Sequence, residues 1–186
     1  MKFDARQVVL LVVNEVGDRA NGKTFIQKLC FFVSKLTGNP LGFRPHYYGP
    51  YSEEVAGELS FLVGGGFLAE SRKGSGVAGD GGWEIARYDY QMTEKGREAL
   101  KFLDEKYRNE CEQVRSALMR VLAAGAVDYV DLSLAAKTVW IRDSDGPSLN
   151  TDGIAGAALR FGWQVTGAQV DRATEFLRKL DLAEVG

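Results

Sequence analysis

The stretch YYGPYSEEVAGELSFLVGGGFLAE, residues 47–70, carries the signals of a turn, a capped helix and a helix stop in immediate succession. Gly49-Pro50 predicts a tight turn, and Ser52 follows at the position of an N-cap. Three glycines at 64–66 end the helix, and the apolar residues behind them begin an extended segment. Within the helix, apolar residues recur at i, i+4 and i+7, which predicts one buried face: Val55, Leu59 and Leu62.

The segments on either side complete a pattern of three helices and a hairpin. Residues 4–16 and 24–36 are predicted helices with apolar stripes, separated by an Asn-Gly turn. Residues 67–72 and 83–92 are predicted strands, joined by a glycine-rich loop that has nothing to bury. This order is typical of a winged helix-turn-helix domain with a two-stranded wing. We therefore predict a mainly α fold of the α+β class, with this domain spanning residues 1–103.

The second half of the chain is predicted to be helical. A connecting helix at about 93–122 has apolar positions to spare, so it could either pack within the chain or form the seam of a homodimer. The last predicted helix repeats the spacing V-x5-F-L of residues 55–62, so its unit is either a second helix-turn-helix-like module or a chance match of two apolar helices. That small helical unit, residues 126–186, is expected to contain helices at 129–141, 152–161 and 168–180.

Composition and charge exclude several functional classes. The formal net charge is −2, so nucleic acid would have to be bound through a local basic patch rather than by a global positive field. Cys30 and Cys111 are far apart and fit no metal-binding spacing, which is typical of thiols in a reducing compartment. The apolar run at 8–13 is too short for a membrane span or a signal sequence. We expect a cytoplasmic protein without membrane attachment.

Two short motifs resemble a known family. The helix sequence IQKLCFF, residues 26–32, is similar to the LQKL-x-Y/F helix of the Panacea (SocA-like antitoxin) domain, and Tyr48-Gly49-Pro50 resembles the YGP signature of that family. The stretches GFL at 66–68 and MTEKG at 92–96 look like the frame of winged-helix domains in general. The resemblance covers residues 22–100 in outline. It implies a largely helical prokaryotic protein that is not an enzyme and acts as an antitoxin, a proteolytic adaptor or another interaction protein.

Protein docking is the first functional hypothesis. Three tyrosines surround the Gly-Pro turn, and tyrosine supplies a large contact area at a low entropic cost. The helix that follows adds acidic side chains, which suit a basic partner such as a toxin or a DNA-binding protein. The alternative for each tyrosine is a structural role, in which its ring caps the core where the second and third helices meet. The candidate protein-binding residues are Tyr47, Tyr48, Tyr51, Glu53, Glu54 and Glu58.

DNA binding is the second hypothesis, because a winged helix reads the major groove with its third helix and touches phosphates with its wing. The third helix argues against this mode, since its exposed face would carry Glu53, Glu54 and Glu58, which phosphates repel. A DNA-binding regulator that uses its wing, with or without the C-terminal unit, is the alternative to docking. Its candidate residues are the basic ones of the second helix and the wing: Lys23, Lys28, Lys35, Arg72, Lys73 and Arg87.

The sequence offers little support for catalysis. The chain has a single histidine, His46, without a Cys or Ser pairing that would predict a nucleophile, and one histidine cannot supply a His-pair metal site. The loop GSGVAG at 74–79 matches G-x-G-x-x-G, but that fingerprint requires a helix after it within a βαβ unit, and a second strand is predicted there instead. We therefore expect no catalytic residues, no metal site and no cofactor.

Overall fold

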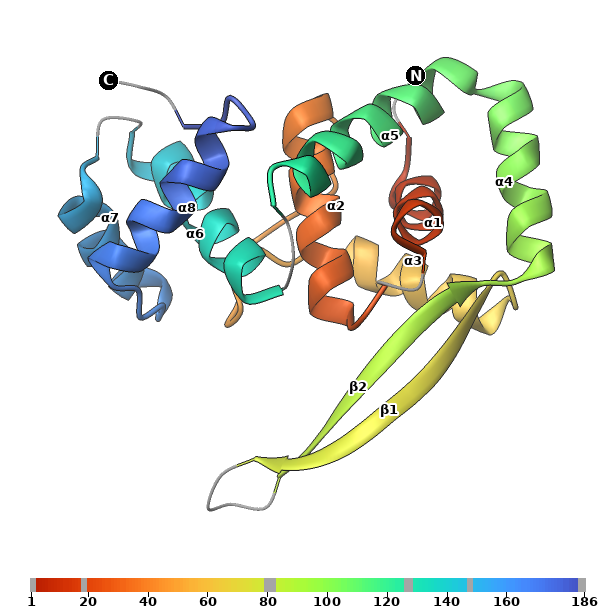
Figure 1. The fold of residues 1–186 in the computed structure, drawn as a ribbon, viewed down its shortest axis with the longest axis horizontal. Helices are drawn as coiled ribbons and strands as arrows, with labels where there is room; N and C mark the ends of the chain where they lie inside the picture. The colour runs from red at the N-terminus through yellow and green to blue at the C-terminus, as the bar shows by residue number, and fades with distance from the viewer. Residues whose placement is uncertain (1–2, 18–19, 79–82, 126–128, 147–148, 184–186) are drawn as a thin grey trace.

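The protein is mainly helical. Among the residues described by the computed structural model it has eight α-helices, one 3-10 turn and a two-stranded antiparallel sheet. Figure 1 shows a helical body from which the sheet projects as a hairpin. The predicted combination of many helices with one small sheet is confirmed. The described residues are 3–17, 20–78, 83–125, 129–146 and 149–183, and for 73–78 and 83–87 the description covers the backbone alone.

Helix α1 (Ala5–Val16) is the central helix of the body. Residues 8–13 are all buried, and a helix that is apolar on every side requires neighbours on every side. Helices α2 (Lys23–Thr37), α3 (Glu53–Gly64) and α5 (Arg108–Ala123) supply these neighbours. Figure 1 shows α1 end-on among them.

Helix α3 forms as its sequence predicts. The Ser52 hydroxyl accepts a hydrogen bond from the Val55 N–H at 3.1 Å, which caps the helix. Strand β1 (Leu68–Ala78) begins after the three glycines, and β2 (Trp83–Met92) pairs with it in antiparallel register. The predicted apolar stripe of α3 is buried: Val55, Leu59 and Leu62.

The hairpin is longer than predicted, because β1 continues to Ala78 instead of ending at residue 72. Strands of 11 and 10 residues extend for roughly 30 Å, and the outer part of the hairpin stands away from the helices (Figure 1). Its base is anchored in the core by the buried side chains of Leu68 and Tyr90. The Tyr90 N–H also donates to the Ala20 carbonyl at 3.0 Å, so the segment before α2 lies along the inner end of β2.

The prediction of one continuous helix at 93–122 is wrong. The chain instead forms α4 (Glu94–Lys106) and α5, with a break at Tyr107, whose φ of −133° and ψ of 45° are not helical. The Tyr107 ring packs edge-to-face on Phe3, with 6.0 Å between the ring centroids. This break turns α5 back across α1 and α2, and the apolar side of α5 is buried there.

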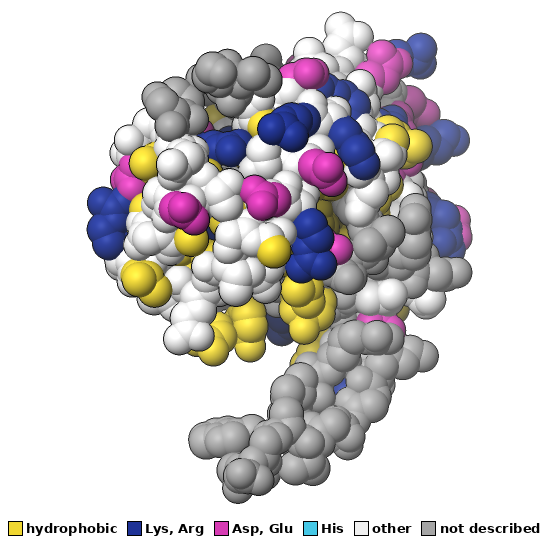
Figure 2. Space-filling model, turned by 60° about the vertical axis from the view of Figure 1, so that its left-hand side comes forward, with side chains coloured by type: hydrophobic (Ala, Val, Ile, Leu, Met, Phe, Trp, Pro, Cys, Tyr) yellow, Lys and Arg dark blue, Asp and Glu magenta, His cyan; other side chains and the backbone are white. Residues whose placement is uncertain are grey.

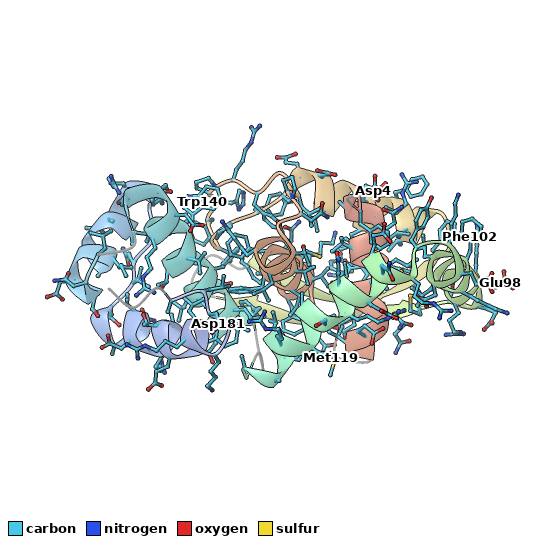
Figure 3. The ribbon with its side chains drawn as sticks, turned by 90° about the horizontal axis from the view of Figure 1, so that it is seen from above. Asp4, Glu98, Phe102, Met119, Trp140 and Asp181 are labelled. Atoms are coloured by element: carbon cyan, nitrogen blue, oxygen red, sulfur yellow. The ribbon has the colours of Figure 1, made fainter. Side chains whose placement is uncertain are left out.

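An ion-pair cluster holds the corner between α4 and α5. The Arg115 guanidinium donates to both carboxylate oxygens of Asp104, at 2.6 and 2.8 Å, and to Glu15 of α1 at 2.8 Å. The bonds from Arg115 lower the pKa of Asp104. The apolar side of α4 faces the core, and its outer side is mostly charged. Glu98 and the exposed Phe102 lie on α4 at the end of the molecule opposite the C-terminal helices (Figure 3).

The predicted C-terminal helices are present within a few residues of their expected ends. They are α6 (Tyr129–Asp145), α7 (Thr151–Ala158) with the 3-10 turn η2 (Leu159–Phe161), and α8 (Gly167–Arg178). They share the main core with the N-terminal helices, since Phe176 packs edge-to-face on Phe32 of α2 at 5.5 Å. A second, smaller apolar cluster lies within the C-terminal unit: Ile141, Ile154, Ala158, Trp163 and Val170.

Both cysteines are buried free thiols. Burial raises the pKa of Cys111 to about 11, and burial likewise raises the pKa of Cys30. Both thiols are therefore protonated and unreactive at neutral pH. In the part of the chain that the structure describes, no helix has both the length and the apolar character needed to cross a membrane.

Candidate docking surface

The loop between α2 and α3 closes into a compact turn at residues 43–51, which we call the aromatic turn. Arg44 and Tyr51 form an antiparallel bridge, with N–O distances of 2.9 and 2.8 Å. The Gly49 N–H donates to the carbonyl three residues earlier at 2.9 Å, and its φ of +97° is a conformation that favours glycine. Hydrogen bonds therefore fix the backbone that carries the two preceding tyrosines.

These two tyrosines are the exposed tip of the aromatic turn. The exposed fractions of Tyr47 and Tyr48 are 71% and 54%, and their rings meet edge-to-face with 4.8 Å between centroids. In Figure 1 the turn reaches below α6, and Figure 2 shows hydrophobic side chains gathered along the lower edge of the face formed by the C-terminal helices. Paired exposed aromatic rings of this kind are typical of contact surfaces.

Gln27 of α2 clamps the turn where it enters α3. Its side-chain amide donates to the Ser52 carbonyl at 2.8 Å, and its side-chain oxygen accepts from the Ser52 N–H at 3.0 Å. All of these groups are buried, so the pair of bonds satisfies backbone groups that water cannot reach. Gln27 belongs to the helix motif at 26–32, but no local pattern in the sequence indicates that it bonds to Ser52.

Lys28 corrects the sequence-based interpretation of α2. Its position off the apolar stripe predicted an exposed residue able to contact phosphate, yet it is only 1% exposed. The aromatic turn covers this side of α2, and the Lys28 ammonium donates to the Pro50 carbonyl at 2.6 Å. Burial, with a smaller contribution from the positive charge of Lys137, lowers the pKa of Lys28 to about 7. Lys28 therefore cannot contact DNA in this fold.

The C-terminal helices hold the turn from its other side. The indole N–H of Trp163 donates to the His46 carbonyl at 2.7 Å, across 117 residues of sequence. The Lys137 side chain of α6 packs against Gly49, where an added Cβ would lie 3.1 Å from its Cγ, and its ammonium lies 5.6 Å from the centre of the Trp163 ring. No local sequence signal marks Trp163 or Lys137 as a neighbour of the turn.

Tyr51 differs from the two tyrosines at the tip. It is half-buried, and its ring lies 5.0 Å from the His46 imidazole in a tilted stack. Beside it is a hollow of about 440 Å³, whose lining includes two exposed carboxylates at the start of α3, Glu53 and Glu54, and the exposed guanidinium of Arg44. Tyr51 therefore lies between the exposed tip and a hollow with two acidic side chains and one basic side chain, and it is not part of the tip.

The third predicted acid, Glu58, differs from Glu53 and Glu54 because its carboxylate is already paired with an arginine of the same chain. Its carboxylate accepts from Arg6 of α1 at 2.7 and 3.2 Å, and the Arg6 guanidinium also lies 4.1 Å from the centre of the exposed Phe61 ring. The bond to Glu58 raises the pKa of Arg6. The acidic surface beside the aromatic turn therefore consists of Glu53 and Glu54.

The described basic candidates are not all on one surface. Lys23 and Lys35 lie at opposite ends of α2, about 18 Å apart along its axis. The Lys23 ammonium lies 5.3 Å from the Tyr88 ring centre, and Lys35 forms an ion pair with Asp143 of α6. Arg72 is exposed on β1. The side chains of the two remaining candidates, Lys73 and Arg87, lie outside the described residues.

The described residues contain no group of three or more His, Cys, Asp or Glu side chains that could hold a metal ion. Comparison with protein-family models and with curated proteins finds no match to this chain. Function must therefore be inferred from the geometry of the chain itself. The aromatic turn combines two adjacent exposed aromatic rings with a hydrogen-bonded backbone.

Proposed function

We propose that this protein is a non-enzymatic prokaryotic interaction or regulatory protein that docks a partner protein through the aromatic turn. The observation that carries the proposal is that two exposed tyrosines stand on a loop held by buried hydrogen bonds from α2 and by a partly buried hydrogen bond from Trp163. A rigid loop loses little conformational entropy when it binds, so its aromatic rings can contribute strongly to affinity. Tyrosine is enriched among the residues that dominate interface energetics.

The chemistry of the neighbouring surface favours a basic partner. Glu53 and Glu54 line the hollow beside Tyr51 with exposed carboxylates, and they outnumber the one basic side chain there, Arg44. A partner that covers the tip with an apolar surface would reach this hollow with an adjoining Lys or Arg. Such opposite charges at the rim of an interface accelerate association and set orientation more than they raise affinity.

The hydrogen bonds between α2 and the aromatic turn support the Panacea-like interpretation, and the order of the elements supports the winged-helix interpretation. The two motifs that suggest the family are far apart in sequence, yet Gln27 and Lys28 of the first bond to Ser52 and Pro50 at the second. The order α1, α2, α3 and hairpin, with residues 20–22 alongside β2, agrees with a winged helix. A cytoplasmic protein of the antitoxin or adaptor type is the corresponding proposal.

The test compares capture of a partner by matched variants. Tyr47→Ser combined with Tyr48→Ser should reduce the amount of co-purified partner about 30-fold, because truncating an interface hot spot weakens binding by about 2 kcal/mol or more. Phe102→Ser is the matched control, since Phe102 is 57% exposed on the far end of the molecule. Both variants should melt close to the wild-type temperature. Equal capture by all three proteins, measured by quantitative mass spectrometry, would rule out the aromatic turn as the docking site.

DNA binding through the hairpin is the second candidate. The observation in its favour is that the hairpin projects from the body with Arg72 exposed on β1. Fluorescence anisotropy on random duplex DNA, titrated from low to physiological salt, separates the two proposals. Binding that falls steeply with salt would indicate several phosphate contacts and favour DNA. An anisotropy that does not change with protein concentration at low salt would rule out DNA binding.

A further inference from the structure

Lys28 is a buried cation in an unusual position. Its ammonium has three N–H donors, and the Pro50 carbonyl is its one hydrogen-bond acceptor among the described residues. The acceptor belongs to the Gly-Pro element of the aromatic turn. Burial of an ammonium group without a counter-ion is costly, so this site favours the neutral amine much more than water does.

The groups that face Lys28 do not relieve this cost. Lys137 reaches it from α6 with a like charge, and burial lowers the pKa of Lys137 as well. Glu53 and Glu54 begin α3, three and four residues after Pro50, and among the described residues neither forms an ion pair with Lys28. His46 and Tyr51 of the turn stack on each other. A proton on Lys28 is therefore opposed by its neighbour and is not neutralised by a carboxylate.

We infer that Lys28 is a proton-sensitive latch: its neutral amine holds the aromatic turn closed against α2, and protonation weakens that hold. The neutral amine still donates one hydrogen bond to Pro50 and needs no counter-ion. The ammonium gains hydration only if the turn moves away and admits water. The biological consequence rests on the proposed docking function, because the latch would then control how rigidly the aromatic turn holds Tyr47 and Tyr48 for a partner.

The test uses Trp163 as a reporter of the turn, because its indole N–H bonds to the His46 carbonyl. In the 186-residue chain with Trp83→Phe and Trp140→Phe, Trp163 fluorescence is recorded from pH 5.5 to 9 without any partner. We expect a transition near pH 7, matching the pKa of about 7 at Lys28. Lys28→Met should abolish it. Lys137→Gln should move it to higher pH, because a neighbouring positive charge is removed.

His46 provides the matched control, because its backbone carbonyl accepts the reporter bond while its side chain takes no part in that bond. His46→Gln should keep the transition, since the reporter bond is made to its backbone carbonyl. A transition that is absent, that survives Lys28→Met or that disappears in His46→Gln would overturn the latch. If Lys28→Met does not fold, NMR titration of the Lys28 side chain in the wild-type chain decides the same question. None of these readouts involves a partner, so their failure is distinct from failure of the docking proposal.

Discussion

Trp163→Ala is expected to lower the free energy of unfolding by about 3–5 kcal/mol, the usual cost of truncating a large buried aromatic side chain. Trp163 is 1% exposed, stacks on Phe161 with 4.8 Å between centroids and completes the smaller apolar cluster. The substitution also removes the indole N–H donor to the His46 carbonyl, so the aromatic turn loses its hydrogen bond to the C-terminal unit.

Urea unfolding followed by circular dichroism measures this change. Trp163→Phe is the control, because it keeps an aromatic ring beside Phe161 but lacks the N–H donor. Its expected cost is smaller, about 1–2 kcal/mol. A Trp163→Ala variant within about 1 kcal/mol of wild type would contradict the structural role assigned to Trp163.

Lys28→Met is expected to change how stability depends on pH. The pKa of Lys28 is about 7 in the folded protein, and the ordinary lysine value of 10.5 applies to the unfolded chain. Between these values the unfolded state binds the proton and the folded state does not, so the stability of the wild type rises with pH across this window. Methionine has no titrating group and removes this contribution.

The measurement is the difference in unfolding free energy between wild type and Lys28→Met at pH 7 and at pH 9.5. We expect this difference to move by about 3 kcal/mol in favour of the wild type, from about 1.4 kcal/mol for each pH unit between the two pKa values. Other groups that titrate in this range, such as exposed lysines, are common to both proteins and cancel. A difference that stays constant with pH would mean that Lys28 has an ordinary pKa.

The elements with local signals were predictable from the sequence. The cap of α3, its buried stripe and its glycine stop each depend on residues within one or two helical turns, and all three are confirmed. The same is true of the C-terminal helices, whose ends are shifted by a few residues. Short-range hydrogen bonding and apolar periodicity decide such features before any tertiary contact is made.

The features that failed depend on contacts between distant segments. Periodicity placed Lys28 on the polar side of α2, but it could not show that the aromatic turn folds over that side. Apolar spacing alone supported one long helix through Tyr107, where packing on Phe3 accompanies the break. The bond from Trp163 joins residues 117 positions apart and leaves no pattern in the sequence.

The candidate site was predictable in composition but not in arrangement. The sequence places three tyrosines and three acids close together, and it cannot distinguish their surroundings. In the structure Tyr47 and Tyr48 are the exposed tip, Tyr51 is half-buried against His46, and Glu58 is paired with Arg6. Exposure and ion pairing depend on which side chains of other elements pack nearby, and local sequence does not show this. The docking proposal therefore centres on Tyr47 and Tyr48, the two tyrosines that the structure leaves exposed.

The most direct measurement of the docking proposal is site-specific photo-crosslinking in native cells. A photoreactive phenylalanine analogue replaces Tyr48 in one protein and Phe102 in the other, two positions with exposed fractions of 54% and 57%. If the aromatic turn docks a partner, position 48 should yield one dominant crosslinked protein that is absent from position 102 and is lost when Tyr47 is changed to serine. Equal crosslinking at both positions, or none at position 48, would contradict the docking proposal.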